Sequence, residues 1–218
     1  MGYEIKSLNI GEPKIYQHNG KELHTAFVKH PVNETLWLSK IGLAGDGQAD
    51  MKNHGGEDKA LLLYPYEHYA YWQHRYEKTF TIPAFGENVT IEGITEDNLY
   101  IGDVYRLGEA LIQVSQPRNP CYKIAAINEL KDITAVVTET GYNGVYFRVL
   151  QEGNVNPDDK LTLVKTNTSQ ISAAYISKIL HHDKQNRKGI ETILQVNEIA
   201  VSLRNSLEKR LAKLKDLT

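Results

Sequence analysis

The stretch IGDVYRLGEALIQVSQPRNPCYK, residues 101–123, decides the fold and carries the most informative chemistry of the chain. Residues 104–107 and 110–115 are short β-type runs joined by a glycine turn, which predicts two adjacent strands. Two prolines then surround an arginine, so the chain turns sharply where the second strand ends. The stretch therefore predicts β-structure that leads through a fixed turn into a new element.

Cys121, the single cysteine of the chain, follows this turn. Asn119 is a suitable helix N-cap and Pro120 suits the first helical position, which predicts that the thiol lies in the opening turn of a helix. Arg118 and Lys123 flank it, and together with the helix dipole these cations favour the thiolate by lowering the pKa of the sulfur. A thiolate binds soft metals or attacks electrophiles. The alternative is a small buried apolar side chain, which is what most lone cysteines are.

The chain before this stretch is dominated by short apolar runs separated by turn residues, a pattern typical of antiparallel β-structure. Asn19-Gly20 supplies the positive φ values of a tight hairpin turn. Pro65 predicts the first turn of a helix that ends near Tyr76. The expected strands are residues 5–10, 14–17, 23–30, 35–41 and 60–64, and after the decisive stretch come a helix over 130–138 and closing strands within 142–153 and 159–165.

The composition changes at Thr166, after which the spacing of apolar residues is helical. Residues 170–182, 187–195 and 196–214 predict three helices. The sequence therefore predicts a mainly β domain over residues 1–165 and a small α-helical domain over residues 166–218. Three helices of this size bury little surface alone, so we expect them to pack on the β domain or on a partner.

Two glycine-containing segments are further candidates for a ligand site. Residues 42–59 are rich in Gly and Asp and end in Lys59, a cation able to neutralise phosphate, although the spacing matches neither a Walker loop nor a Rossmann fingerprint. The Phe-Gly-Glu-Asn turn presents Glu87 and Asn88 just before a strand. The alternative for both segments is a turn with no ligand. Arg148 is either aimed at the site or an outward-facing charge on a strand.

Composition excludes several classes of function. The formal net charge is −2, which gives no footprint for a nucleic acid polymer or an acidic membrane. No run approaches the length of a membrane span and the start of the chain lacks a signal-peptide pattern, so we expect a cytoplasmic protein. His54, His68 and Asp50 lack the spacing of a first-row metal site. A Cys121–His54 hydrolytic pair has no local signature either.

Five segments together resemble the MOSC family (molybdenum cofactor sulfurase C-terminal-like), and specifically its YiiM-like branch. They are GLAGDGQAD (42–50), HGGEDKALLLYPYEHYAYW (54–72), FGENVT (85–90), the stretch 101–123 and GYNGVYFRVLQEG (141–153). The resemblance runs from near the start to about Thr166, and the remainder resembles the three-helix tail of that branch. It implies a MOSC-type β-barrel with a few short helices.

The resemblance also implies a site for the molybdenum cofactor (Mo-molybdopterin), with Cys121 as the ligand to molybdenum. Carried over by position, the other pocket candidates are His54, Lys59, Glu87, Asn88 and Arg118, while Lys123 and Arg148 add positive charge for the cofactor's phosphate. The implied activity is reduction of N-hydroxylated compounds, including hydroxylamino-purine base analogues, with electrons from a separate reductase. His54 is the first candidate for the acid that protonates the leaving oxygen.

Two alternatives remain on the same fold. In one, Cys121 carries a persulfide for delivery to another protein, although the chain lacks the pyridoxal-phosphate module that accompanies such carriers. In the other, the barrel binds cofactor without catalysis and the helical tail docks a partner. The sequence leaves the oligomeric state open, with a homodimer as one possibility.

Overall fold

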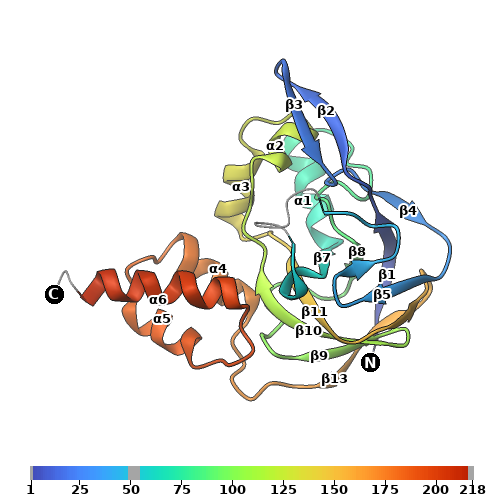
Figure 1. Cartoon of the computed structure of the whole chain (residues 1–218). Helices are drawn as coiled ribbons and strands as arrows, with labels where there is room; N and C mark the ends of the chain where they lie inside the picture. The colour runs from blue at the N-terminus through green and yellow to red at the C-terminus, as the bar shows by residue number, and fades with distance from the viewer. Residues whose placement is uncertain (1, 49–54, 216–218) are drawn as a thin grey trace.

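Seven strands close into a barrel in the part of the chain that this computed structural model describes, residues 2–48 and 55–215 (Figure 1). Their order is β13-β9-β10-β11-β7-β8-β1. The first and last strands of this order, β13 and β1, pair with each other and so close the sheet into a ring. β4 (His30–Val32) extends the sheet beside β1. The barrel strands are β1 (Gly2–Ile10), β7 (Leu61–Pro65), β8 (Val89–Glu92), β9 (Val104–Leu107), β10 (Ala110–Pro117), β11 (Val145–Gln151) and β13 (Lys160–Lys165).

The alternating pattern of the decisive stretch determines which side chains fill the barrel. Along β10, Ala110, Ile112 and Val114 are buried, whereas Leu111 and Gln113 are partly exposed. The hairpin of β9 and β10 pairs antiparallel, as the glycine turn predicts. The predicted mainly β class with a barrel and a helical tail is confirmed.

One pair of barrel strands differs from the expected antiparallel pattern. β7 and β8 run parallel and are joined through helix α1 (Glu67–Tyr76), which forms a crossover connection. The prediction that Pro65 begins this helix is wrong, because Pro65 still pairs with Ile91 of β8 and the helix begins at Glu67. Trp72 of α1 packs into a second apolar cluster beside the barrel.

The predicted hairpin turn at Asn19-Gly20 is confirmed. Asn19 and Gly20 have φ of 50° and 72° and connect β2 (Lys14–His18) to β3 (Lys21–Thr25). The predicted strand over 23–30 is wrong in its middle, because the backbone N–H of Phe27 donates to Thr25 Oγ1 (3.1 Å) and the chain bends away before β4. A small sheet of β12 (Gly153–Val155), β5 (Leu36–Ser39) and β6 (Gly42–Leu43) lies beside the barrel.

Two short helices, α2 (Lys123–Asn128) and α3 (Ile133–Thr140), follow the Cys121 turn. The predicted helix start is wrong by three residues: the backbone N–H of Ile124 donates to the Cys121 carbonyl, and helical structure begins only at Lys123. Cys121 therefore lies in the turn immediately before the N-cap of α2 and not within the helix.

The helical tail consists of α4 (Ala173–His181), α5 (Arg187–Leu194) and α6 (Val201–Lys215), which lie together on one side of the barrel (Figure 1). Their buried side chains, such as Ile176 and Leu207, belong to the same apolar cluster as the barrel interior. The tail thus buries its apolar face against the barrel. Within the described residues, no helix is long and apolar enough to cross a membrane.

Candidate functional site

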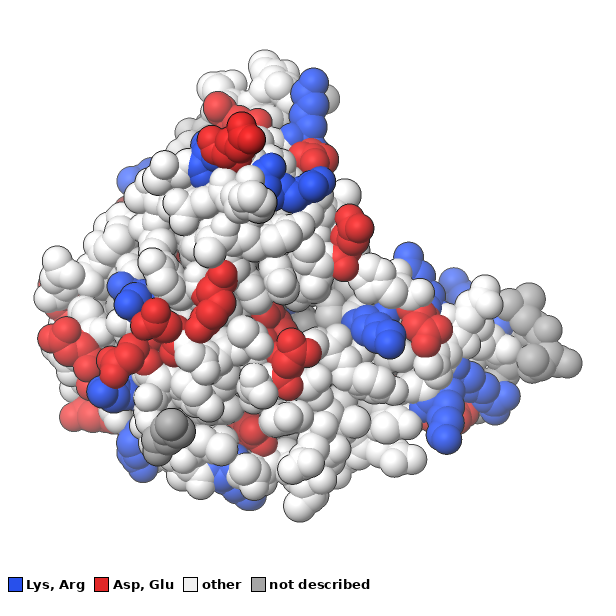
Figure 2. Space-filling view, turned by 180° about the vertical axis from the view of Figure 1, so that it is seen from behind, with Lys and Arg blue, Asp and Glu red and all other residues white. Residues whose placement is uncertain are grey.

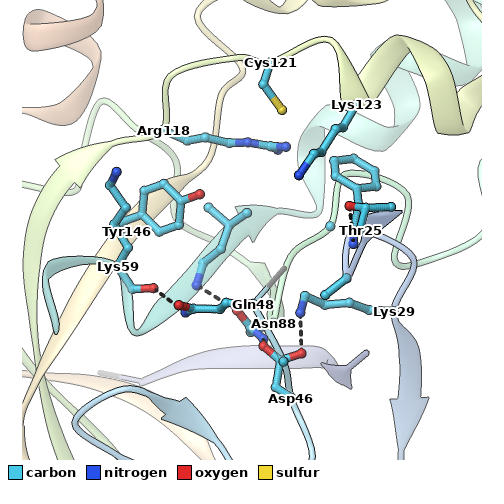
Figure 3. Close-up of a pocket in the computed structure, with 15 residues that line it drawn as sticks. Thr25, Lys29, Asp46, Gln48, Lys59, Asn88, Arg118, Cys121, Lys123 and Tyr146 are labelled. Carbon is cyan, nitrogen blue, oxygen red and sulfur yellow. Dashed lines mark hydrogen bonds and ion pairs between the residues drawn. The ribbon is translucent and has the colours of Figure 1, made fainter. Parts of the chain in front are cut away.

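The decisive stretch ends at a pocket in the barrel wall, drawn in Figure 3. This pocket is narrow, with a volume of about 80 Å³. Four of its residues also line a larger groove of about 890 Å³ between the barrel and the helical tail, so the two spaces meet. The shared residues are Lys59, Cys121, Lys123 and Tyr146.

Arg118 is buried in the pocket wall, with 4% of its surface exposed. Its Nη1 donates to the Phe85 carbonyl (2.7 Å), and its guanidinium lies 5.4 Å from the centroid of the Phe27 ring. Its Nε atom is buried and has no hydrogen-bond partner among the described residues. A buried N–H without an acceptor is costly, so this side chain is suited to receive an anion.

Gly86 lets Phe27 lie against this arginine. Its φ is 74°, and a Cβ atom there would meet the Phe27 ring at 2.9 Å. A larger residue would therefore push the ring away from the pocket. This is the physical role of the glycine in the Phe-Gly-Glu-Asn turn.

Cys121 is half-buried and its sulfur points toward the ends of Arg118 and Lys123 (Figure 3). The Cys121 carbonyl accepts a hydrogen bond from Thr134 Oγ1 (3.3 Å), which ties the turn to α3. Two cations near one sulfur favour the thiolate form. The structure thus brings together Cys121, Arg118 and Lys123 as the sequence predicts.

Tyr146 of β11 is a pocket residue that sequence reasoning missed. Burial raises the pKa of its hydroxyl, and the negative charge of a Cys121 thiolate raises it too, while Arg118 lowers it. The phenol therefore keeps its proton at neutral pH. The sequence offered one signal, since Tyr146 lies in the segment that carries Arg148, but the alternation along the strand alone did not say which residue faces the pocket.

A buried ion pair between Lys29 and Asp46 forms the floor of the pocket. Asp46 also accepts from the backbone N–H of Gly11 (2.8 Å) and from Asn88 Nδ2 (2.8 Å). Asn88, a predicted pocket residue, thus lines the pocket and connects its floor to β7 by accepting from Leu62 N. Lys29 itself lies in no motif, and its partner Asp46 is 17 residues away in the glycine-rich segment 42–50.

Glu87, another predicted pocket residue, is not brought into the pocket. It is fully buried and accepts hydrogen bonds from the Tyr69 hydroxyl, Phe85 N (2.9 Å) and Thr90 Oγ1 (3.0 Å). These contacts fix the shape of the turn from inside. Glu87 therefore supports the pocket wall without facing a ligand.

Arg148 is not brought into the pocket either. Its guanidinium forms an ion pair with Asp58 (2.7 Å) and donates to Gln113 Oε1 (3.0 Å) and to the Glu198 carbonyl (2.8 Å). The expectation that Arg148 binds cofactor is corrected, because these three contacts occupy its guanidinium and connect the barrel to the tail.

His54 lies outside the described residues, as does Asp50. His68 is buried, its Nε2 lies within hydrogen-bond distance of Glu96 Oε2 (2.7 Å), and it does not line the pocket. Among the described residues no group of three or more His, Cys, Asp or Glu side chains is arranged to hold a metal ion.

Comparison with known proteins gives a consistent result. The family model "MOSC domain" matches residues 50–162, and the model "YiiM-like, 3-alpha helix domain" matches residues 171–214. The uncharacterized protein YflK of Bacillus subtilis (strain 168) is 43% identical over 212 residues, covering 97% of this chain and 96% of that protein. Protein YiiM of Escherichia coli (strain K12) is 39% identical over 189 residues, covering 85% and 84%.

The solved structures agree. The crystal structure of YiiM from Geobacillus stearothermophilus matches with a TM-score of 0.83 and 39% identity, covering 96% of this chain and 99% of that one. That of YiiM from Escherichia coli matches with a TM-score of 0.79 and 32% identity, covering 98% and 94%.

A protein of Gibberella moniliformis (strain M3125 / FGSC 7600) named "Reductase" is 28% identical over 165 residues, which cover 74% of this chain and 29% of that protein. The chain belongs to the MOSC-domain family and carries a YiiM-like three-helix domain.

Proposed function

We propose that this protein binds the molybdenum cofactor through Cys121 and reduces N-hydroxylated compounds such as hydroxylamino-purine base analogues, with electrons from a separate reductase. The observation that carries the proposal is the convergence of one thiol and several cations in a single pocket at the barrel wall. Membership of the MOSC family and the distant relative named "Reductase" support it. The residues that line the pocket come from six separate segments of the chain.

The chemistry of the pocket fits this cofactor. A half-buried thiol beside two cations is a soft ligand suited to molybdenum. The cofactor also carries a phosphate, and the buried Nε of Arg118 is a donor with no partner among the described residues. Lys123 and Lys59 line the same pocket and add positive charge. We therefore assign Cys121 to the metal and Arg118, Lys123 and Lys59 to the phosphate.

When bound, the cofactor supplies the two-electron redox chemistry that cleavage of an N–O bond requires. The protein's own part is to fix the thiolate, to neutralise the anionic end and to hold a proton nearby. Tyr146 Oη holds such a proton, because burial and the neighbouring thiolate raise its pKa. We therefore assign to Tyr146 the donation of a hydrogen bond, or of a proton, to the oxygen that leaves nitrogen. His54 remains a second candidate for that role.

The reduction consumes two electrons for each N–O bond that is cleaved. We assign the supply of these electrons to a separate reductase as partner, with the N-hydroxylated compound as a small-molecule substrate.

The decisive test is Cys121→Ala in protein made by a host that synthesises the cofactor. Because a small side chain replaces a small one, we expect an unchanged melting temperature. Molybdenum content and reduction of 6-hydroxylaminopurine with a chemical reductant should both fall to background. Cys121→Ser, which keeps the size of the side chain and removes the soft ligand, should behave in the same way.

The outcomes separate the alternatives. Full activity in Cys121→Ala would sink the proposal. Mass spectrometry that finds a labile sulfur on Cys121 of the parent, with no turnover, would favour the sulfur carrier. Cofactor content with neither turnover nor labile sulfur would favour the non-enzymatic adaptor.

A further inference from the structure

The groove of about 890 Å³ joins the proposed reaction site to the helical tail. One wall comes from the barrel, including Gln116, Cys121 and Tyr146, and the other from the tail. The tail wall consists of Leu180 and His181 at the end of α4, Lys184 just after it, and Ser202, Leu203, Ser206 and Arg210 of α6. A volume of this size is in the range of small-molecule sites, roughly 300–1,000 Å³.

Positive charge is concentrated in this groove. Lys59, Lys123, Lys184 and Arg210 line it, whereas Glu22 is the carboxylate that the described residues contribute. The whole chain has a formal net charge of −2, and on the face shown in Figure 2 acidic side chains are spread over the barrel among basic ones. The cations of the groove are therefore a local feature and not part of a generally basic surface.

Three of the groove's cations form no ion pair with a carboxylate of the described residues. In the described part of the chain, the ion pairs do not involve Lys123, Lys184 or Arg210. Arg210 Nη1 donates to the carbonyls of Ile179 (3.2 Å) and Leu180 (3.4 Å), which holds its guanidinium at the end of α4. Its charge thus stays fixed at the groove.

His181 adds a polar group beside this charge. Its Nε2 is buried and has no hydrogen-bond partner among the described residues. Burial lowers the pKa of its imidazole, and His182, Lys184 and Arg210 lower it further, so the ring is neutral at pH 7. The tail wall therefore offers two cations and one neutral ring nitrogen to a ligand.

The rest of the groove suits a planar, mostly apolar body. Leu23, Leu203 and Tyr146 are largely buried side chains that line it, and Tyr122 adds an exposed aromatic ring. Gln116 supplies a buried amide. Aromatic rings and an amide are the groups that proteins use to hold a purine.

We propose that the groove binds an N-hydroxylated nucleoside monophosphate, with its base toward Cys121 and its phosphate on Lys184 and Arg210 of the helical tail. This inference rests on the proposed function, which supplies the N-hydroxylated base and its orientation toward Cys121. The helical tail then forms one wall of the substrate site. The barrel wall carries the residues assigned to the cofactor, and the tail wall carries none of them, so the tail cations remain for the substrate.

The test is a direct binding measurement with the full chain, in cofactor-free and cofactor-loaded forms. Calorimetric titrations use adenosine 5′-monophosphate, adenosine and inorganic phosphate as separate probes. We expect the monophosphate to bind more tightly than either adenosine or phosphate alone. Lys184→Ala should weaken the monophosphate about fivefold and leave adenosine unchanged, since it removes one solvent-accessible charge pair. Lys184→Arg should retain the preference, because it keeps the charge.

Lys188→Ala is the matched control, because Lys188 is an exposed lysine of the neighbouring helix α5 that does not line the groove. Equal affinity for adenosine and its monophosphate, no binding of either, or an unchanged affinity in Lys184→Ala would overturn the inference. Phosphate binding as tight as the monophosphate would overturn it as well, because the base would then contribute nothing.

The outcome of this experiment is independent of the outcome of the Cys121→Ala test of the proposed function. Binding is measured without turnover, so a preference for the monophosphate survives even if Cys121→Ala stays active. Conversely, the protein could reduce the free base in a Cys121-dependent way and yet show no preference for the monophosphate. That result would leave the proposed function intact and overturn only the inference that the substrate is a nucleotide.

Discussion

Arg118 shows how a single residue joins fold and chemistry in this protein. It follows directly on β10, its backbone N–H donates to the Gly144 carbonyl (2.9 Å) just before β11, and its side chain reaches into the pocket wall. Phe85 and Phe27 hold the guanidinium in place. Because one buried N–H lacks an acceptor among the described residues, the residue carries a cost that a bound anion would remove.

Tyr146→Phe tests the proton donor at the same scale. The variant keeps the buried ring and removes only the hydroxyl, so molybdenum content should stay unchanged. Turnover should fall about 100-fold, as expected for the loss of a positioned acid. Tyr16→Phe, in the β2–β3 hairpin, is the control.

Steady-state kinetics with parallel metal analysis would separate the possible roles. Unchanged turnover would show that another group donates the proton, and His54 would then be the next candidate. Loss of molybdenum would instead assign the hydroxyl to cofactor binding.

The sequence predicted the cationic neighbours of the thiol but missed part of the pocket. Arg118 and Lys123 were visible because they adjoin Cys121 in the chain. Lys29 and Tyr146 are distant from Cys121 in the chain and come near it only in the folded pocket, which a local pattern does not encode. Glu87 illustrates the opposite error, a residue predicted to line the pocket that does not. Its carboxylate accepts from Phe85 N and so stabilises the turn instead of facing a ligand.

At the scale of elements, Asp58 connects three parts of the molecule. Its carboxylate pairs with Arg148 of β11 and accepts from the backbone N–H of Val201 (2.8 Å), the first residue of α6. Its carbonyl accepts from Ser115 Oγ of β10 (2.5 Å). The start of α6 is therefore held by a carboxylate from the short 3-10 turn at Glu57–Lys59, just before β7.

Asp58→Asn should loosen this junction. The amide keeps one acceptor but loses the charge that compensates Arg148, so we expect the free energy of unfolding to fall by about 1–3 kcal/mol. Hydrogen exchange in the first turn of α6 should accelerate, while the barrel strands away from the junction keep their protection. Asp158→Asn, at an exposed turn before β13, serves as control. Equal exchange in both variants would show that apolar packing alone holds the tail.

Elements were predictable where local chemistry decides them. Asn19-Gly20 fixed its hairpin because both residues tolerate positive φ. Pro65 misled because its ring suits a helix start equally well, while its true role in β7 depends on a parallel partner 26 residues later, at Ile91. The helix boundary at Cys121 was wrong for a related reason: Asn119 and Pro120 are residues that suit a helix start, whereas α2 begins after Tyr122, without a side-chain cap.

At the scale of the whole molecule, the two apolar clusters include three buried tyrosines. Tyr64 and Tyr69 lie in the cluster around α1, and Tyr105 lies in the barrel. Burial raises the pKa of all three hydroxyls, and the carboxylates Glu96, Glu87 and Asp103 contribute. The folded protein therefore keeps these phenols neutral where an unfolded chain ionises them.

This arrangement predicts loss of stability in alkali. The pKa values are higher in the folded than in the unfolded state, so the stabilisation is complete below pH 10 and falls as the pH rises above it. We expect a loss of roughly 1 kcal/mol for each of the three tyrosines by pH 11. Urea denaturation between pH 8 and pH 11 gives the free energy, and absorbance near 295 nm reports the ionisation. Constant stability over that range would contradict the assigned burial.

The pairing of β1 with β13 sets the order in which this chain can complete its fold. Gly2 lies opposite Thr162 in that pair, so the ends of the closing seam are separated by almost the whole barrel sequence. Contacts of such high sequence separation slow folding, and during synthesis the first strand must wait until β13 has left the ribosome. Until then β1 can pair only with β8 along one edge and with β4 at residues 8–10 of the other, so residues 2–4 of that second edge stay open to wrong neighbours.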